Sequence, residues 1–135
     1  MPAGYSGTPL AKKLGYKPGM IAYVSGAPAN YAALLAPAPD GVEFRARPGK
    51  SLGLAHVFVV QRAKLEAALP GLMKAIEPDG MIWVSWPKKA AKVATDITED
   101  VIREVALPLG LVDVKVCAVD ETWSGLKLVI QRERR

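Results

Sequence analysis

The stretch LPGLMKAIEPDGMIWVSW, residues 69–86, decides the fold that we expect for this chain. It starts as an apolar helical segment, passes through a Glu-Pro-Asp-Gly turn at residues 77–80 and ends in an apolar run at residues 81–86. A strand that is apolar at successive positions is buried on both faces, which is typical of a mostly parallel sheet covered by helices. The stretch therefore predicts half of a βαβ unit and an α/β fold.

Turn residues divide the first part of the chain into short elements. A helix over residues 10–14 is predicted to end at Gly15, because glycine is the common residue just past a helix end. Apolar residues 20–24 then predict a central strand, and residues 30–36 are helical by composition. Residues 42–46 alternate in polarity and predict an edge strand with one exposed face.

The elements next to the central stretch follow from the same patterns. His56 opens an apolar run at residues 56–60, which predicts a strand that begins at this histidine. The start of a parallel strand lies opposite the edge where ligands bind, so we expect a structural or solvated histidine. Residues 64–76 have helical periodicity, and Pro70 should kink or restart that helix because proline has no backbone N–H.

After the central stretch, the sequence predicts a helix and a hairpin. Asp96 and Glu99 have the spacing of a capping box at the start of a helix that ends before Gly110. Carboxylates are stabilised at a helix start, so this acidic region needs no metal to explain it. Residues 111–119 and 126–131 predict two antiparallel strands.

Together these elements predict a three-layer, Rossmann-like α/β fold, with a mostly parallel sheet of about six strands that ends in an antiparallel hairpin. A chain of 135 residues with 50% hydrophobic content is long enough for one such domain, residues 1–135. Cys117 is the only cysteine, which excludes an intrachain disulfide and argues against structural zinc. With no signal-peptide pattern and no membrane-spanning apolar run, we expect a cytoplasmic protein.

The charge is moderately basic and unevenly distributed. Eighteen Lys and Arg against 13 Asp and Glu give a net charge of +5 and a pI near 9.4, with most of the excess in residues 1–50. This charge admits nucleic acid, phosphorylated ligands or anionic surfaces as partners, and it is also ordinary for a solvated surface. The triplet Gly49-Lys50-Ser51 is not a phosphate loop, because the chain after it leads into a predicted strand, whereas that motif leads into a helix.

The order of the predicted elements resembles the Rossmann-type methyltransferases, in truncated form. The Pro-Gly turns within residues 14–19 and 76–80 stand where that superfamily has similar turns before its strands. The phrases at residues 3–10, 83–89 and 119–127 resemble a family of small bacterial proteins classified as a domain of unknown function. The second resemblance implies no activity.

The sequence departs from the methyltransferase pattern at the cofactor positions. After the first strand that superfamily has an acidic residue and a glycine-rich turn, whereas this chain has Ser25-Gly26-Ala27-Pro28. Arg45 ends the second strand, where an acidic residue would hold the ribose hydroxyls. One strand and its helix are also missing between residues 46 and 55. These departures disfavour S-adenosylmethionine as the cofactor.

In open α/β sheets, ligands bind outside the carboxyl ends of the strands, near the switch point. Two tryptophans with cations and carboxylates at that edge suit a flat or anionic ligand, which stacking and charge-assisted hydrogen bonds would hold. The alternative is that both tryptophans are packing residues and the charges solvate the sheet edge. The candidate ligand-binding residues are Ser25, Gly26, Asn30, Gln61, Arg62, Trp86, Lys88, Lys89, Asp120, Glu121 and Trp123.

No catalytic residue or metal ligand is assigned, because Ser85 and Cys117 lie in predicted strands with no activating partner apparent in the sequence. Our leading hypothesis is a non-catalytic Rossmann-like domain that binds a small molecule or a protein partner at the strand-end edge. The alternative is a small S-adenosylmethionine-dependent methyltransferase-like enzyme. A second alternative is weak nucleic-acid binding through the basic N-terminal half. We expect no membrane partner.

Overall fold

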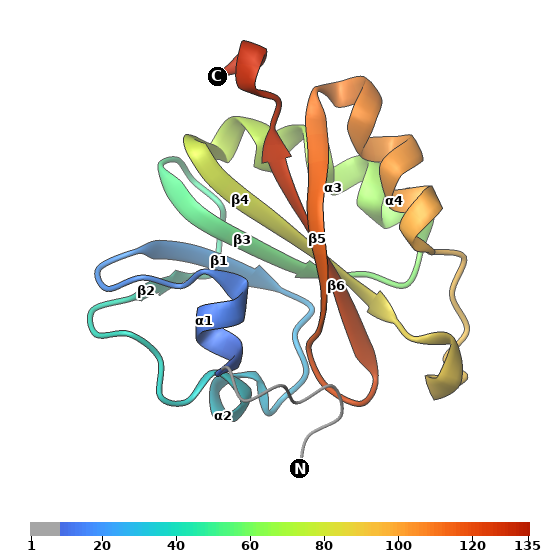
Figure 1. Cartoon of the computed structure of the whole chain (residues 1–135), viewed down its shortest axis with the longest axis horizontal. Helices are drawn as coiled ribbons and strands as arrows, with labels where there is room; N and C mark the ends of the chain where they lie inside the picture. The colour runs from blue at the N-terminus through green and yellow to red at the C-terminus, as the bar shows by residue number, and fades with distance from the viewer. Residues whose placement is uncertain (1–8) are drawn as a thin grey trace.

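The computed structural model describes residues 9–135, which form a six-stranded sheet with helices on both faces (Figure 1). This arrangement confirms the expected Rossmann-like α/β fold. Most of the N-terminal phrase at residues 3–10 lies outside the described residues. In the order β2-β1-β3-β4-β6-β5, the strands are β1 (Ile21–Ser25), β2 (Glu43–Arg45), β3 (Leu52–Phe58), β4 (Ile76–Pro87), β5 (Leu111–Ala118) and β6 (Trp123–Ile130).

The sheet has a parallel part and an antiparallel part. Strands β2, β1, β3 and β4 run parallel, and β6 then enters antiparallel between β4 and β5. The short edge strand β2 and the terminal hairpin β5–β6 both occur where the sequence predicts them. The order of the elements along the chain therefore agrees with the expected one.

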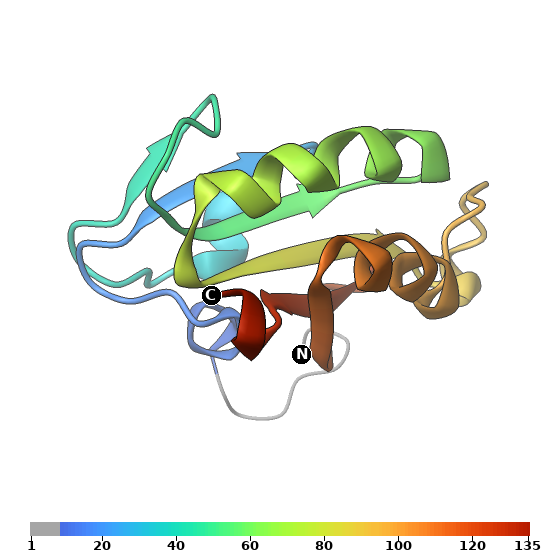
Figure 2. The ribbon, with the colours of Figure 1, turned by 90° about the horizontal axis from the view of Figure 1, so that it is seen from above.

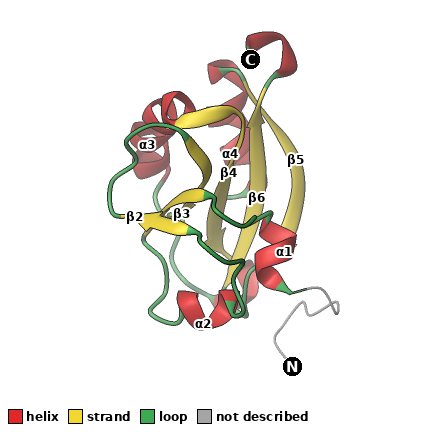
Figure 3. Cartoon of the chain, turned by 90° about the vertical axis from the view of Figure 1, so that its left-hand side faces the viewer, coloured by secondary structure: helices red, strands yellow, loops and turns green. Residues whose placement is uncertain are grey.

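The helices form two groups, as Figure 3 shows. Helices α1 (Leu10–Leu14) and α2 (Tyr31–Leu35) pack on one face with Leu54, Phe58 and Trp83 of the sheet. Helices α3 (Arg62–Ala75) and α4 (Glu99–Ala106) cover the other face. Figure 2 shows α3 along β3, on the side of the sheet opposite α1.

Three short 3-10 helices, Lys89–Ala91, Leu107–Leu109 and Arg132–Arg134, complete the described elements. In the part of the chain from residue 9 onward, no helix combines the length and apolar character needed to cross a membrane.

The prediction that the β3 strand begins at His56 is wrong. Strand β3 begins at Leu52, and His56 lies inside it with no exposed surface. The strand starts earlier because Leu52 and Leu54 are fully buried partners of Ile76 and Met81 in β4. His56 is therefore a core residue and does not lie on either edge of the sheet.

The turn predicted at residues 77–80 is a bulge inside β4. Leu52 pairs with Ile76 and Leu54 pairs with Met81, so two steps along β3 match five along β4. The residues at 77–79 project to solvent while the strand continues on both sides. A Pro-Gly turn sequence is compatible with such a bulge because the extra residues make no ladder hydrogen bonds.

Helix α3 does not restart at Pro70, and the prediction about the cap of α4 is wrong. Helix α3 continues through Pro70, an exposed position where water can solvate the carbonyl that loses its partner. Asp96 does not cap α4, because Thr98 is its N-cap and the Thr98 hydroxyl accepts from the Val101 N–H at 3.2 Å. The Asp96 carboxylate instead accepts from the Arg62 N–H at 2.7 Å, at the start of α3. It therefore links the loop after β4 to α3.

Candidate functional site

The predicted strand-end edge exists. Ser25 pairs with Val57 at the ends of β1 and β3, and the end of β4 pairs with the start of β6 through Pro87 and Trp123. The Lys88 N–H also donates to the Thr122 carbonyl at 2.7 Å, which fixes the loop after β4 to the hairpin turn. The carboxyl ends of the parallel strands and the hairpin turn thus lie at one edge.

The two tryptophans at this edge do not face one ligand position. Trp86 is 9% exposed and belongs to the core under α3 and α4. Trp123 packs on the opposite face, where its ring centroid lies 5.1 Å from that of Phe58 at an interplanar angle of 89°. Trp86 pairs with Ser124 rather than with Trp123, so the alternation of side chains along a strand places the two rings on different faces. Both tryptophans contribute to packing.

Two of the charged candidates, Arg62 and Asp120, make contacts within the protein. The Arg62 guanidinium donates to Glu66 at 3.3 Å and to Glu104 at 2.8 Å, which connects α3 to α4. These hydrogen bonds raise the pKa of Arg62. The Asp120 carboxylate accepts from the N–H groups of Thr122 and Trp123, both at 2.8 Å, which fixes the hairpin turn.

Of the remaining candidates, Gly26 is required by the geometry of its turn, and the others are exposed or half-buried. Gly26 has a φ of +72°, and a Cβ there would lie 2.7 Å from the Phe58 carbonyl oxygen, so only glycine fits this turn. Asn30 is exposed at the start of α2. Lys89 and Glu121 are exposed, and Lys88 is half-buried.

A cavity of about 660 Å³ extends beside β1 and α3, from the carboxyl ends of β1 and β3 to the loop after β2 and the last turn of α3. Of the predicted candidates, it brings together Ser25 and Gln61. Sequence reasoning missed most of the other lining groups, which come from β1, the loop after β2, the end of β3 and α3. They include Tyr23, Pro48, Gly49, Val57, Val59, Lys64, Ala68, Gly71 and Leu72.

The strand order explains the position of this cavity. The chain leaves β1 through α2 on one face and leaves β3 through α3 on the other, so the order reverses between these two strands. Crevices at such a switch point are the usual ligand sites of open α/β sheets. The strand and helix missing between residues 46 and 55 are the signal that predicts an uncovered face beside β1. The small residues Ala68 and Gly71 of α3 keep that space open.

A buried chain of hydrogen bonds lies on the other face. Tyr16 and Tyr31 share a hydrogen bond of 2.8 Å between their hydroxyls, and Tyr31 bonds His56 Nδ1 at 2.8 Å. His56 Nε2 then lies 2.7 Å from Ser85 Oγ. The sequence shows no partner for Ser85 because the histidine that bonds it lies 29 positions away in the chain.

This serine–histidine pair is structural. His56 and Ser85 have no exposed surface, and neither lines the 660 Å³ cavity. Burial lowers the pKa of His56 to about 3, so the imidazole is neutral. Burial also raises the pKa of Tyr16 to about 12, and it raises the pKa of Tyr31. The four side chains satisfy one another in the core and are out of reach of a substrate.

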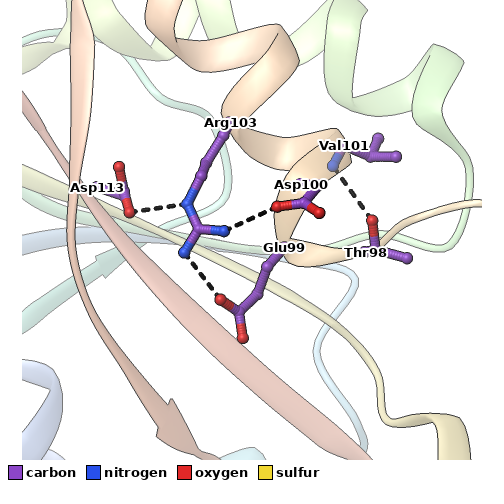
Figure 4. Close-up of polar contacts among 6 residues, drawn as sticks. All are labelled: Thr98, Glu99, Asp100, Val101, Arg103 and Asp113. Atoms are coloured by element: carbon purple, nitrogen blue, oxygen red, sulfur yellow. Dashed lines mark hydrogen bonds and ion pairs between the residues drawn. The ribbon is translucent and has the colours of Figure 1, made fainter.

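Three acidic residues near α4 are paired with Arg103, as Figure 4 shows. The Arg103 guanidinium donates to Asp113 at 2.9 Å, to Glu99 at 2.8 Å and to Asp100 at 3.1 Å. The hydrogen bond from Arg103 lowers the pKa of Asp113 and raises that of Arg103. These contacts join α4 to β5.

Comparison with known protein families finds no match for this chain. Comparison with curated proteins finds none either.

Solved structures are similar to it. Ribosomal protein L11 methylase from Lactobacillus delbrueckii subsp. bulgaricus is 12% identical, with a TM-score of 0.56, over 91% of this chain and 76% of that one. Magnesium protoporphyrin IX methyltransferase (ChlM) from Synechocystis PCC 6803, with bound SAH, is 13% identical, with a TM-score of 0.58. The match covers 84% of this chain and 75% of that one. LepI in complex with SAM is 12% identical, with a TM-score of 0.57, over 92% of this chain and 47% of LepI. At these identities the likeness shows the fold.

These similarities correct our leading functional hypothesis. The structures that share the fold include named methyltransferases and complexes with SAM or SAH, which contradicts the expectation of a non-catalytic domain and supports its alternative. The resemblance in element order to a truncated Rossmann-type methyltransferase is confirmed. The likeness to a small bacterial family stays an expectation.

Proposed function

We propose that the protein is a small methyltransferase-like enzyme that binds S-adenosylmethionine in the cavity at the switch point. The observation that carries this proposal is a cavity of about 660 Å³ that reaches the carboxyl ends of β1 and β3, in a sheet like that of a methyltransferase. Its volume lies within the range of about 300–1,000 Å³ that is usual for small-molecule sites. The single cysteine of the sequence, which allows no intrachain disulfide, supports a cytoplasmic location for this enzyme.

The lining residues fit the adenosine and carboxylate parts of that ligand. Val57, Ala68 and Leu72 give apolar walls suited to an adenine ring. Ser25 and Gln61 offer a hydroxyl and an amide for ribose hydroxyls. When bound, S-adenosylmethionine supplies a methyl group on a positively charged sulfur, and these residues bind and orient it and exclude water.

Charge in the cavity sets the order of affinities that we expect. Lys64 is the cation of the lining and suits the carboxylate of the ligand, whereas no described Asp or Glu lines the cavity. Arg45, at the end of β2, is bound to Glu43 at 2.7 Å and to the Lys50 carbonyl at 3.2 Å. The sulfonium cation therefore has no counter-charge among the lining groups. We expect the neutral sulfur of S-adenosylhomocysteine to bind more tightly.

Isothermal titration calorimetry with S-adenosylmethionine, S-adenosylhomocysteine and adenosine tests the proposal. We expect saturable binding of both adenosyl compounds, tighter for S-adenosylhomocysteine, and weaker binding of adenosine. No binding of any of the three at millimolar concentration would overturn the proposal.

A blocking variant tests the position of the site. Gly71 lines the cavity, and a Cβ added there meets no atom within 4 Å, so Gly71→Phe places a ring in open space. We expect this variant to lose at least about tenfold in affinity for S-adenosylhomocysteine. Ala67→Phe is the matched control, because Ala67 is exposed on the same helix and does not line the cavity. Thermal unfolding checks that both variants fold, and equal losses would contradict the assignment.

A charge variant tests the role of Lys64. Lys64→Met should weaken the binding of S-adenosylhomocysteine about tenfold. It should leave the affinity for adenosine unchanged, because adenosine has no carboxylate. Lys74→Met, at an exposed position of the same helix, is the control. Equal weakening of both ligands by Lys64→Met would contradict the assigned contact.

A further inference from the structure

Three lysines gather on the face of the sheet that carries α1. Lys115 of β5 and Lys127 of β6 are directly paired across the strands, and Lys17 lies in the loop between α1 and β1. Burial lowers the pKa of Lys127, and the charges of Lys115 and Lys17 lower it further. We call Lys17, Lys115 and Lys127 the lysine patch.

Among the described residues, no ion pair joins the lysine patch to a carboxylate. Within residues 9–135, every salt bridge uses an arginine and none includes a lysine of the patch. Like charges directly opposite each other in a sheet are destabilising. Because no ion pair within residues 9–135 offsets this repulsion, an anionic partner is the group that would relieve it.

An aromatic side chain and a small cavity lie beside Lys17, on the same face of the sheet as Lys115 and Lys127 but toward its β2 edge. Phe44 of β2 is 49% exposed, and its ring centroid lies 5.8 Å from that of Tyr16, which precedes Lys17 in the chain. Phe44 also borders an apolar cavity of about 190 Å³ with Tyr31 and Leu35. This volume is below the usual range of about 300–1,000 Å³ for a whole ligand and suits one flat ring.

We propose that this surface binds single-stranded nucleic acid, with phosphates on the lysine patch and one base stacked on Phe44 at the 190 Å³ cavity. Cations that track a backbone, together with an exposed aromatic ring, are the usual parts of a single-strand site. An acidic peptide or an anionic lipid surface would use the charges and leave the ring-sized cavity unused. The site lies on the sheet face that carries α1 and α2, so it is separate from the switch-point cavity beside α3 on the other face.

Fluorescence anisotropy with a labelled twelve-nucleotide oligothymidine, measured from 25 to 200 mM salt, tests this site. Three phosphate contacts predict that log K falls with log salt with a slope of about −2. Lys115→Gln with Lys127→Gln should reduce that slope to about −0.7. The control is Lys74→Gln with Lys92→Gln, two exposed lysines outside the patch, which makes the same charge change and should keep the slope.

Phe44→Ala tests the stacking contact separately. We expect this variant to bind the oligonucleotide about 5- to 150-fold more weakly. The slope of log K against log salt should stay the same, because a base–aromatic stack carries no charge. Phe44 is half exposed, so the variant should keep its fold, and thermal unfolding confirms this.

Three results would overturn the proposal. They are no binding of the oligonucleotide at 25 mM salt, the same reduction of the salt slope in the control variant as in the patch variant, or full affinity in Phe44→Ala. Polyglutamate and phosphatidylserine vesicles serve as competing probes. If either binds through the patch as tightly as the oligonucleotide does, the surface recognises charge alone and the nucleic-acid assignment is wrong.

Discussion

Protonation of His56 should make the protein lose stability in mild acid. His56 is fully buried between Tyr31 and Ser85, and burial lowers its pKa from 6.5 to about 3. Below pH 6.5 the unfolded chain binds a proton that the folded protein excludes. The contribution of the neutral imidazole is therefore fully present above pH 6.5 and is lost as the pH falls from 6.5 toward 3.

The size of the effect follows from these two pKa values. Between pH 7 and pH 5 the unfolded state gains about 2 kcal/mol relative to the folded state from this one group. His56 is the only histidine, so no other imidazole contributes in this range. The loss is a large fraction of the roughly 5–15 kcal/mol that holds a typical domain folded.

Urea unfolding of the wild type and of His56→Gln, followed from pH 5 to pH 7, measures this contribution. The variant is less stable at every pH because Tyr31 and Ser85 lose a partner, but its stability should fall by about 2 kcal/mol less than that of the wild type. Parallel curves would refute the reasoning. If the variant does not fold, the ring protons of His56 in the wild type decide the matter by NMR, because a titration midpoint near 6.5 in the folded protein would also refute it.

Three substitutions test other parts of the structure by chemical denaturation. Gly71→Ala should stabilise the protein by about 0.5–1 kcal/mol, because the helical backbone accepts alanine and the new Cβ meets no atom within 4 Å. A loss of stability would show that the cavity wall is closed there. Gly26→Ala should destabilise by at least about 1–3 kcal/mol, since φ is +72° and the Cβ would lie 2.7 Å from the Phe58 carbonyl oxygen. Asp96→Ala should cost about 1 kcal/mol by removing the acceptor of the Arg62 N–H, and an unchanged midpoint would contradict that contact.

Local patterns were enough to predict most elements. Gly15 ends α1 in a left-handed conformation with a φ of 92°, as its place after an apolar helix indicates. The apolar run of β4 and the alternating residues of β2 also lie where periodicity places them. The errors arose where a distant partner competes with a local signal. Asp96 looks like a cap for the next helix, but its carboxylate meets the start of α3, 34 residues earlier.

The site was predicted less completely than the fold. The rule for strand ends selected the edge that the cavity reaches and two residues of its lining, Ser25 and Gln61. It also selected Trp86, which packs in the core, and Arg62, which connects α3 to α4 through Glu104. A sequence shows that a residue follows a strand, but it does not show which face or neighbour that residue meets.

The sequence by itself determined the order and type of the elements, because helical and strand periodicity and Pro-Gly turns act over a few residues. Only the tertiary structure decided that His56 meets Ser85 and Tyr31, that Lys115 lies opposite Lys127, and that a cavity opens beside β1. The physical reason is that these features depend on strand register and on which sheet face each helix covers. Both are set by packing between segments that lie far apart in the chain.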